Sequence, residues 1–496
     1  MRQAAPAAAL ILLAACTVGP DYQRPPAPVA AAYKEQEGWK PAEPRDAADR
    51  GAWWSIYDDP VLDGLERQID VSNQTLKAAE AAYRQAQAVV GEARAGLFPT
   101  ISLTGSGTRS GQGGGSTIVT TVGPTATTSN SSRRGGGSVS NIDLAGSASW
   151  DIDLWGRIRR TVESDVASAQ ASAADIASAR LSAQGQLATF YFELRSADQQ
   201  QRLLSAAVDA FGQALRITRN QYSAGIAAQT DVVTAQTQLE QTRSQLIAVG
   251  VTRAQFEHAI AVLIGKPPAE FSLAPAPIAT AVPVAPTGVP STLLERRPDI
   301  ASAERLMASA NAQIGVAISG YYPDLTLSAS YGFANSGLSK LLRASNSLWS
   351  VGASLAETLF NGGLTAAQVA AARAGYDQTV AAYRQTVLTG FQQVEDELAA
   401  LRILAQQAEV EANTVRLARE AERLTLNQYQ QGTVAYTAVI TAQTTRLNNE
   451  VTALGIQQSQ LVASVALVQA LGGGWSAADL PDDARIKAEA PSFFGP

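Results

Sequence analysis

The chain has 496 residues, which suggests two to four domains, and its formal net charge is −6. Only 17% of the residues are charged, against about 25% in a typical soluble domain, and no block of lysine or arginine indicates a nucleic-acid partner. One cysteine and one histidine exclude a disulfide framework, a thiolate metal site and histidine-based acid–base chemistry. We therefore expect neither an enzyme nor a metal-binding protein.

The N-terminus contains a short apolar segment that ends at the only cysteine. Arg2 precedes a nine-residue apolar run over 7–15, which is far shorter than the roughly 20 residues of a membrane-spanning helix. Residues 1–15 are therefore predicted to be a signal peptide. The sequence Leu-Ala-Ala before Cys16 is similar to a bacterial lipobox, so Cys16 is predicted to become the acylated N-terminus of the mature chain. The alternative is a buried structural cysteine.

The segment after Cys16 and the middle of the chain are both rich in proline. Residues 16–50 are rich in proline and alanine and are predicted to be a tether between the lipid and the folded body. No apolar run beyond the first one is judged long enough for a membrane helix, so any membrane crossing would have to use strands. Residues 266–290 form a second proline-rich segment, and residues 472–496 follow the last helical pattern.

The proline-rich middle separates two copies of one plan, 51–265 and 291–471. Residues 221–236 match 428–443 at nine of sixteen positions with a constant offset of 207. The segment that begins at Gly96 recurs at Gly320 in the same order. Two matches in order indicate an internal duplication.

Each copy is predicted to contain a helix, a strand hairpin and a long helix pair. Apolar residues step by threes and fours from about 363 to 429, and 157–222 is the counterpart. Each would form about 100 Å of helix, which must pack as a coiled coil. Tight turns are expected near Gly225 and Gly432, because glycine suits a positive φ. A filamentous coiled coil is the alternative.

The hairpins are predicted at about 100–154 and 324–360. Leu325 and Leu327 alternate with Thr326 and Ser328, and residues 142–154 alternate in the same way. Strands of about ten residues with one apolar and one small-polar face are typical of a membrane barrel wall, although a half-buried soluble sheet also alternates. Residues 105–138 are predicted to be a long extracellular loop.

Four strands are too few to close a membrane barrel, because the smallest bacterial barrels have about eight. An open sheet edge in lipid is also forbidden. Several chains would therefore share one barrel. Two chains would supply eight strands and three would supply twelve. A conducting pore favours three or more copies, because side chains fill an eight-stranded barrel.

Three segments carry a family resemblance: residues 16–25, the Trp53-Trp54 segment through Leu62, and residues 294–315 beginning Leu-Glu-Arg-Arg-Pro-Asp-Ile. With the duplication, they make the chain similar to the TolC-like outer-membrane efflux proteins, specifically their NodT/OprM-like lipoprotein branch. The resemblance implies a homotrimer with a twelve-stranded outer-membrane β-barrel continued by a periplasmic α-helical barrel. It also implies a passive exit duct that works with a periplasmic adaptor and an inner-membrane RND-type pump.

The resemblance also assigns candidate residues at the periplasmic tip. Gly225 and Gly432, with Tyr222 beside the first turn, would form the gate and adaptor-docking region. Asp231 and Tyr429 match an acidic residue and a tyrosine of the TolC aperture, and a hydrogen bond between them could close the tip. The acidic ring of the second repeat in TolC aligns here with Ala438 and Thr441, so closure is expected to rest on hydrogen bonds and apolar side chains instead of an aspartate ring.

Three aspartates are candidates for the pore lining. Asp143, Asp151 and Asp153 fall on the small-polar phase of a predicted strand, where they would either favour cations or serve only as solvated lining. No cofactor is expected beyond the covalent lipid on Cys16. Drugs or other small compounds are the expected cargo. The alternative function is a trimeric adhesin or envelope structural lipoprotein, whose strands would gather at one end of the chain instead of in two hairpins.

Overall fold

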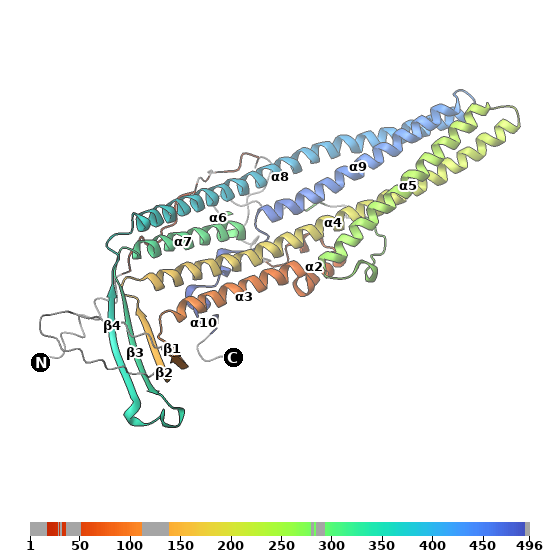
Figure 1. Ribbon diagram of the computed structural model, residues 1–496. Helices are drawn as coiled ribbons and strands as arrows, with labels where there is room; N and C mark the ends of the chain where they lie inside the picture. The colour runs from red at the N-terminus through yellow and green to blue at the C-terminus, as the bar shows by residue number, and fades with distance from the viewer. Residues whose placement is uncertain are drawn as a thin grey trace, which may run out of the picture.

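The structure is a computed structural model that describes residues 17–27, 29, 32–35, 51–111, 138–278, 282–283 and 293–491. A four-stranded sheet lies at one end of an elongated helical bundle, and the two turns between the long helices lie at the other end (Figure 1). The extracellular loop was predicted over 105–138, but residues 105–111 and Ser138 belong to the two strands of the first hairpin. Cys16 and residues 112–137 of that loop lie outside the described residues.

The described elements run in the following order: η2 (Trp53–Tyr57), α2 (Pro60–Ser72), α3 (Gln74–Ala95), β1 (Thr100–Gly111), β2 (Ser138–Ile152), α4 (Arg157–Ser223), α5 (Gln229–Leu263), η3 (Pro268–Glu270), α6 (Leu293–Arg296), α7 (Pro298–Ser319), β3 (Asp324–Asn335), η5 (Leu338–Lys340), η6 (Ala344–Asn346), β4 (Ser347–Ala356), α8 (Leu364–Gln430), α9 (Tyr436–Ala470), η7 (Ala477–Asp479) and α10 (Asp483–Glu489).

The two long helices have the lengths that the sequence pattern predicts. Helices α4 and α8 each contain 67 residues, which corresponds to about 100 Å. Each begins after a glycine in the left-handed region, Gly156 at φ 82° and Gly363 at φ 90°. Glycine adopts this conformation without the steric cost of a Cβ, so the same residue type sets the start of both helices.

Four shorter helices flank the long ones. Helices α3 and α5 both pack on α4, and α7 and α9 pack between α4 and α8. Helices α5 and α3 meet end to end, because the Asn73 side chain donates to the Leu263 carbonyl at 2.7 Å and Ser72 Oγ donates to the Ile264 carbonyl at 2.5 Å. The order across the bundle is therefore α3/α5, α4, α7/α9 and α8, which leaves α3/α5 and α8 at its two edges.

The sheet is antiparallel in the order β1-β2-β3-β4, and its register keeps like faces together. On one face Leu144 pairs with Phe333, and Leu325 pairs with Leu355. On the other face the hydroxyls of Ser102 and Ser147 lie 2.8 Å apart. The side chains of the apolar face are exposed, as Ile101, Trp349 and Val351 show at 80%, 75% and 76%. The four predicted strands with an apolar and a small-polar face are confirmed.

The main core lies midway along the bundle, where η2 and α2 pack on α4, α5 and α9. Trp53, Trp54 and Tyr57 from the motif near the N-terminus are all buried. Asp59 caps α2 through the Val61 amide and accepts a hydrogen bond from the Tyr191 hydroxyl at 2.6 Å. This motif therefore packs η2 and α2 onto the long helices.

The segment predicted to be a tether contacts the bundle over its described residues. The Tyr22 hydroxyl donates to Glu304 on α7 at 2.5 Å, and Arg24 donates to the Tyr383 hydroxyl on α8. Tyr33 is 5% exposed among side chains of α8 and α9. The sequence analysis missed this docking, because the proline- and alanine-rich composition of the segment does not show which single tyrosines pack on the helices.

Helices α5 and α9 are long and apolar enough to cross a membrane, judged by length and composition alone. The expectation that no later run reaches this threshold is therefore wrong. Both helices mix alanine, valine and leucine with threonine and glutamine and carry few charges. Each is the antiparallel neighbour of a 67-residue helix within the bundle, so composition alone does not assign them to lipid.

Candidate functional site

The small-polar face of the sheet carries two of the three predicted pore-lining aspartates. Asp151 accepts a hydrogen bond from Thr326 on β3 at 2.8 Å, and Asp143 accepts one from Asn141 at 2.7 Å. Both are followed along the same face by serine and threonine side chains. This face is hydrophilic and suits water, whereas the opposite face suits lipid.

Asp153 does not belong to this wall. It follows the end of β2, its side chain is 8% exposed, and it accepts hydrogen bonds from the backbone amides of Ile158 and Arg159. It also forms an ion pair with the Arg159 guanidinium at 3.2 Å. A carboxylate is stabilised at a helix N-terminus by unpaired amides, so Asp153 anchors α4 to the sheet and its assignment to the pore lining is corrected.

The two helix turns at the opposite end have the same geometry. Gly225 and Gly432 adopt φ 75° and 74°, and a Cβ at either position would meet open space. The Ile226 side chain beside the first turn is 77% exposed. The glycines are therefore required by their backbone conformation and not by close packing, and the turns are accessible.

The predicted tip residues form different contacts from those expected. The Tyr429 hydroxyl donates to Gln221 Oε1 on α4, and its ring lies 5.3 Å from that of Tyr436. Asp231 Oδ2 instead accepts from the Ala228 amide at 3.2 Å and so caps α5. Within the described part of one chain, the predicted Asp231–Tyr429 hydrogen bond is not formed. Tyr222, the repeat counterpart of Tyr429, is 47% exposed.

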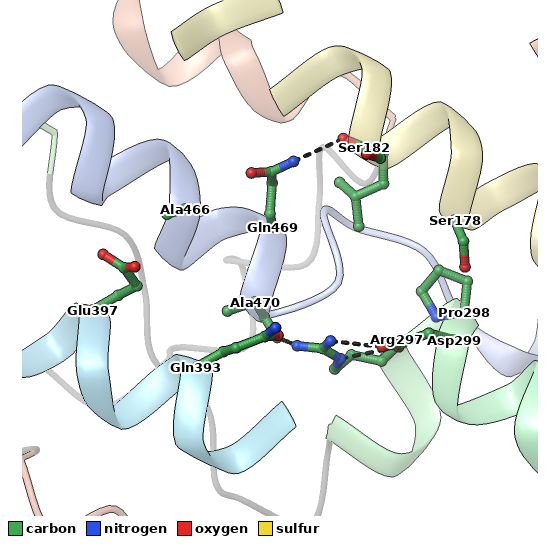
Figure 2. A pocket seen from close by; sticks show the side chains of 11 residues that line it. Ser178, Ser182, Arg297, Pro298, Asp299, Gln393, Glu397, Ala466, Gln469 and Ala470 are labelled. Carbon is green, nitrogen blue, oxygen red and sulfur yellow. Dashed lines mark hydrogen bonds and ion pairs between the residues drawn. The ribbon is translucent and has the colours of Figure 1, made fainter. Parts of the chain in front are cut away.

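A cavity of about 380 Å³ lies where α4, α7, α8 and α9 meet (Figure 2). Arg297 Nη1 donates to the Ala470 carbonyl at the end of α9, and the same guanidinium binds both oxygens of Asp299. Burial raises the pKa of Glu397 on the cavity wall, with a smaller contribution from the charge of Asp396. Arg297 thus joins α9 to α7, as Asn73 joins α5 to α3.

Sequence reasoning missed the residues that make these contacts. Gln221 and Tyr436 lie beside the tip glycines, and the recurrence of Gln-Tyr at 221 and 428 was the available signal. Arg297 belongs to the motif that carried the resemblance, but a motif does not reveal that its arginine caps another helix. Within the described residues no group of three or more histidine, cysteine, aspartate or glutamate side chains could hold a metal ion.

The geometry defines a component of a membrane channel, because one sheet face suits lipid, the other suits water, and the helices extend far beyond a bilayer's thickness. A family model described as outer membrane efflux protein matches residues 65–266 and 289–473. The chain belongs to this family, and it is an outer-membrane channel component of an efflux pump. The fold class and function expected from the resemblance are confirmed, and the family is one of channels and not of enzymes.

Individual relatives match along nearly the whole chain. The antibiotic efflux pump outer membrane protein ArpC of Pseudomonas putida is 28% identical, with 94% of each chain covered. The pyoverdine export outer membrane protein OpmQ of Pseudomonas aeruginosa is 29% identical, over 94% of this chain and 97% of OpmQ. The solved outer-membrane channel OprN is 26% identical with a TM-score of 0.82, over 93% of this chain and all of OprN.

Proposed function

We propose that three copies of this chain share one twelve-stranded barrel and one helical conduit. The observation that carries this proposal is the open sheet: β1 and β4 each have a single neighbour within the described residues. An unpaired strand edge is not tolerated in lipid, and three copies of four strands close a barrel wide enough for a pore. The bundle has matching open edges at α3/α5 and α8.

The N-terminal segment supports acylation of Cys16. The backbone amide of Val18 donates to the Trp155 carbonyl at 3.0 Å, in the connection between β2 and α4. Gly19 packs directly on Gly315, where a Cβ would lie 2.4 Å from the neighbouring Cα. The residues that follow Cys16 are thus held at the end of the sheet, where a lipid attached to Cys16 would reach the bilayer surface.

The anchor is tested by Cys16→Ser. The variant should lose incorporation of labelled fatty acid and accumulate as the uncleaved precursor. Channel insertion should persist, because the shared barrel itself holds the protein in the membrane. An intact mass that shows an unmodified N-terminus at another residue would contradict acylation.

The tip of the bundle is proposed as the gate and as the docking place of a periplasmic adaptor. The Tyr429–Gln221 hydrogen bond ties α8 to α4 beside the turns. One such bond contributes about 1 kcal/mol, so three copies would favour the closed state by several kcal/mol. The inner-membrane partner is proposed to be an RND-type pump that supplies the energy, with drugs or other small compounds as cargo.

Recordings in planar bilayers test the gate. Tyr429→Phe removes the hydroxyl, keeps the ring contact with Tyr436, and should raise the conductance of the isolated channel. Asp231→Ala is the matched control at the same depth and should change conductance less, because Asp231 caps its own helix. Equal conductance of Tyr429→Phe and the wild type would assign closure to other contacts at the turns.

A further inference from the structure

The duplication extends to the bounds of most of the paired elements and therefore contains information about how copies meet. Helix α3 and strand β1 become α7 and β3 when 224 is added to every residue number, at both ends of each element. Helices α4 and α5 become α8 and α9 when 207 is added, again at both ends. The β1–β2 pairing Thr100↔Ser149 becomes Asp324↔Ala356 of β3–β4 with the same two offsets.

One strand pairing has no counterpart among the described residues of the chain. Strand β2 pairs with β3 through eleven residues, from Ile142↔Asn335 to Ile152↔Leu325. The counterpart of β2 is β4 and the counterpart of β3 is β1, which lie at opposite edges of the same sheet. The β2–β3 contact joins the first repeat to the second, so the equivalent contact must join the second repeat to the first repeat of another copy.

We propose that β4 of one copy pairs antiparallel with β1 of the next in the register that the duplication transfers from β2–β3. The known pair Ser147↔Ser330 becomes Ser354 opposite Ser106 of the next copy, and the last pair becomes Leu359 opposite Ile101. This inference rests on the shared barrel proposed above and adds the register in which the barrel closes.

The faces of the strands agree with this register. Leu359 and Ile101 are 90% and 80% exposed, and the register places both on the apolar face. Ser354 and Ser106 fall together on the small-polar face. A shift by one residue would put apolar side chains opposite polar ones along the whole seam.

The end of β4 gives a second indication. Strand β4 stops at Ala356, three residues before Leu359, which is the counterpart of the last residue of β2. The last residues of β2 are held by β3 and lie beyond the start of β1. Residues 357–359 have no such neighbouring strand in the part of the chain that the structure describes. They are therefore expected to join β4 when β1 of the next copy pairs with them.

The helices support the same seam independently of the strands. Within the chain, Gln469 of α9 lies over α4 and donates to the Leu181 carbonyl at 3.1 Å. The counterparts of these residues are Val262 and Leu388, which are 63% and 47% exposed. The duplication thus brings two exposed apolar side chains together between copies, and their burial is favourable.

Disulfide trapping in detergent-purified protein tests the register. Ser106→Cys combined with Ser354→Cys should give covalent trimers on oxidation, because directly opposite residues have Cα atoms about 4.5–5.5 Å apart, within disulfide range. Strands β1 and β4 of one chain are about 14 Å apart across the sheet, so the pair cannot close within a chain. Ser147→Cys with Ser330→Cys is the matched control and should close within monomers.

Two further pairs separate the outcomes. Ser354→Cys with Thr108→Cys is displaced by one same-face position and should not cross-link, whereas Ser110→Cys with Ser350→Cys lies in the proposed register and should. Trimers from the displaced pair alone would overturn the register. Native trimers that no pair cross-links would overturn the β4–β1 contact, and a native monomer would instead overturn the shared barrel of the proposed function.

Discussion

Glu66 offers a sharp test of the packing of α2, because replacing it should stabilise the protein. Its side chain is fully buried on the face of α2 that packs on the bundle, and neither carboxylate oxygen has a hydrogen-bond partner. Burial, followed by the charges of Asp70 and Asp63, raises the pKa of Glu66 from 4.5 to about 9. The folded state therefore holds the protonated form through neutral pH.

The sign of the effect follows from proton linkage. The pKa of Glu66 is higher in the folded protein than in the unfolded chain. The stability that protonated Glu66 allows is therefore fully present below about pH 4.5, and the wild type loses it as the pH rises toward 9. Each pH unit in this window corresponds to about 1.4 kcal/mol. The stability of Glu66→Gln relative to the wild type should therefore grow by about 4 kcal/mol between pH 5 and pH 8.

The assay is thermal unfolding of the detergent-purified protein across this pH range. Glu240→Gln is the matched control, since Glu240 forms an exposed pair with Arg243 that contributes less than about 1 kcal/mol. The midpoint difference between Glu66→Gln and the wild type should widen with pH, and that for the control should stay flat. A constant difference for Glu66→Gln would mean that the carboxylate is ionised in the folded protein.

Two further predictions concern the buried charges and the helix junctions. Asp198 is fully buried between Arg195 at 3.1 Å and Arg253 at 2.7 Å, so Asp198→Ala should destabilise the protein by about 3–5 kcal/mol in denaturant titrations; a loss below about 1 kcal/mol would contradict the pairing. Gly472→Ala should prevent accumulation of folded protein in the membrane fraction, because the added Cβ would lie 2.1 Å from the backbone oxygen of Arg296, just before α7. Gly225→Ala is the control, since its Cβ meets open space and the substitution should cost only about 1–2 kcal/mol. Equal yields of the two variants would contradict the close contact between the end of α9 and the start of α7.

Periodicity was sufficient to predict the long helices and the faces of the strands. Apolar residues at helical spacing over a run without proline leave few alternatives for α4 and α8. Alternation likewise determines which strand residues share a face, although not which chain covers the edges. The duplication indicates how the edges are covered, because the offset of 224 relates α3 and β1 to α7 and β3, and the offset of 207 relates α4 and α5 to α8 and α9.

Single polar side chains were predicted less well. Asp153 continues the alternation of β2, yet it turns to α4, because a carboxylate at a helix start can be satisfied by two amides and an arginine. Asp231 and Tyr429 lie at equivalent depths, but each finds a partner on a neighbouring turn or helix. Such choices depend on distances of a few ångströms between helices, which a sequence pattern does not contain.

Native mass spectrometry of the detergent-purified protein tests the central claim, a barrel shared by several copies, most directly. The open edges of β1 and β4 predict a single species at three times the mass of the mature chain. A folded monomer that retains its strand content would contradict the shared barrel.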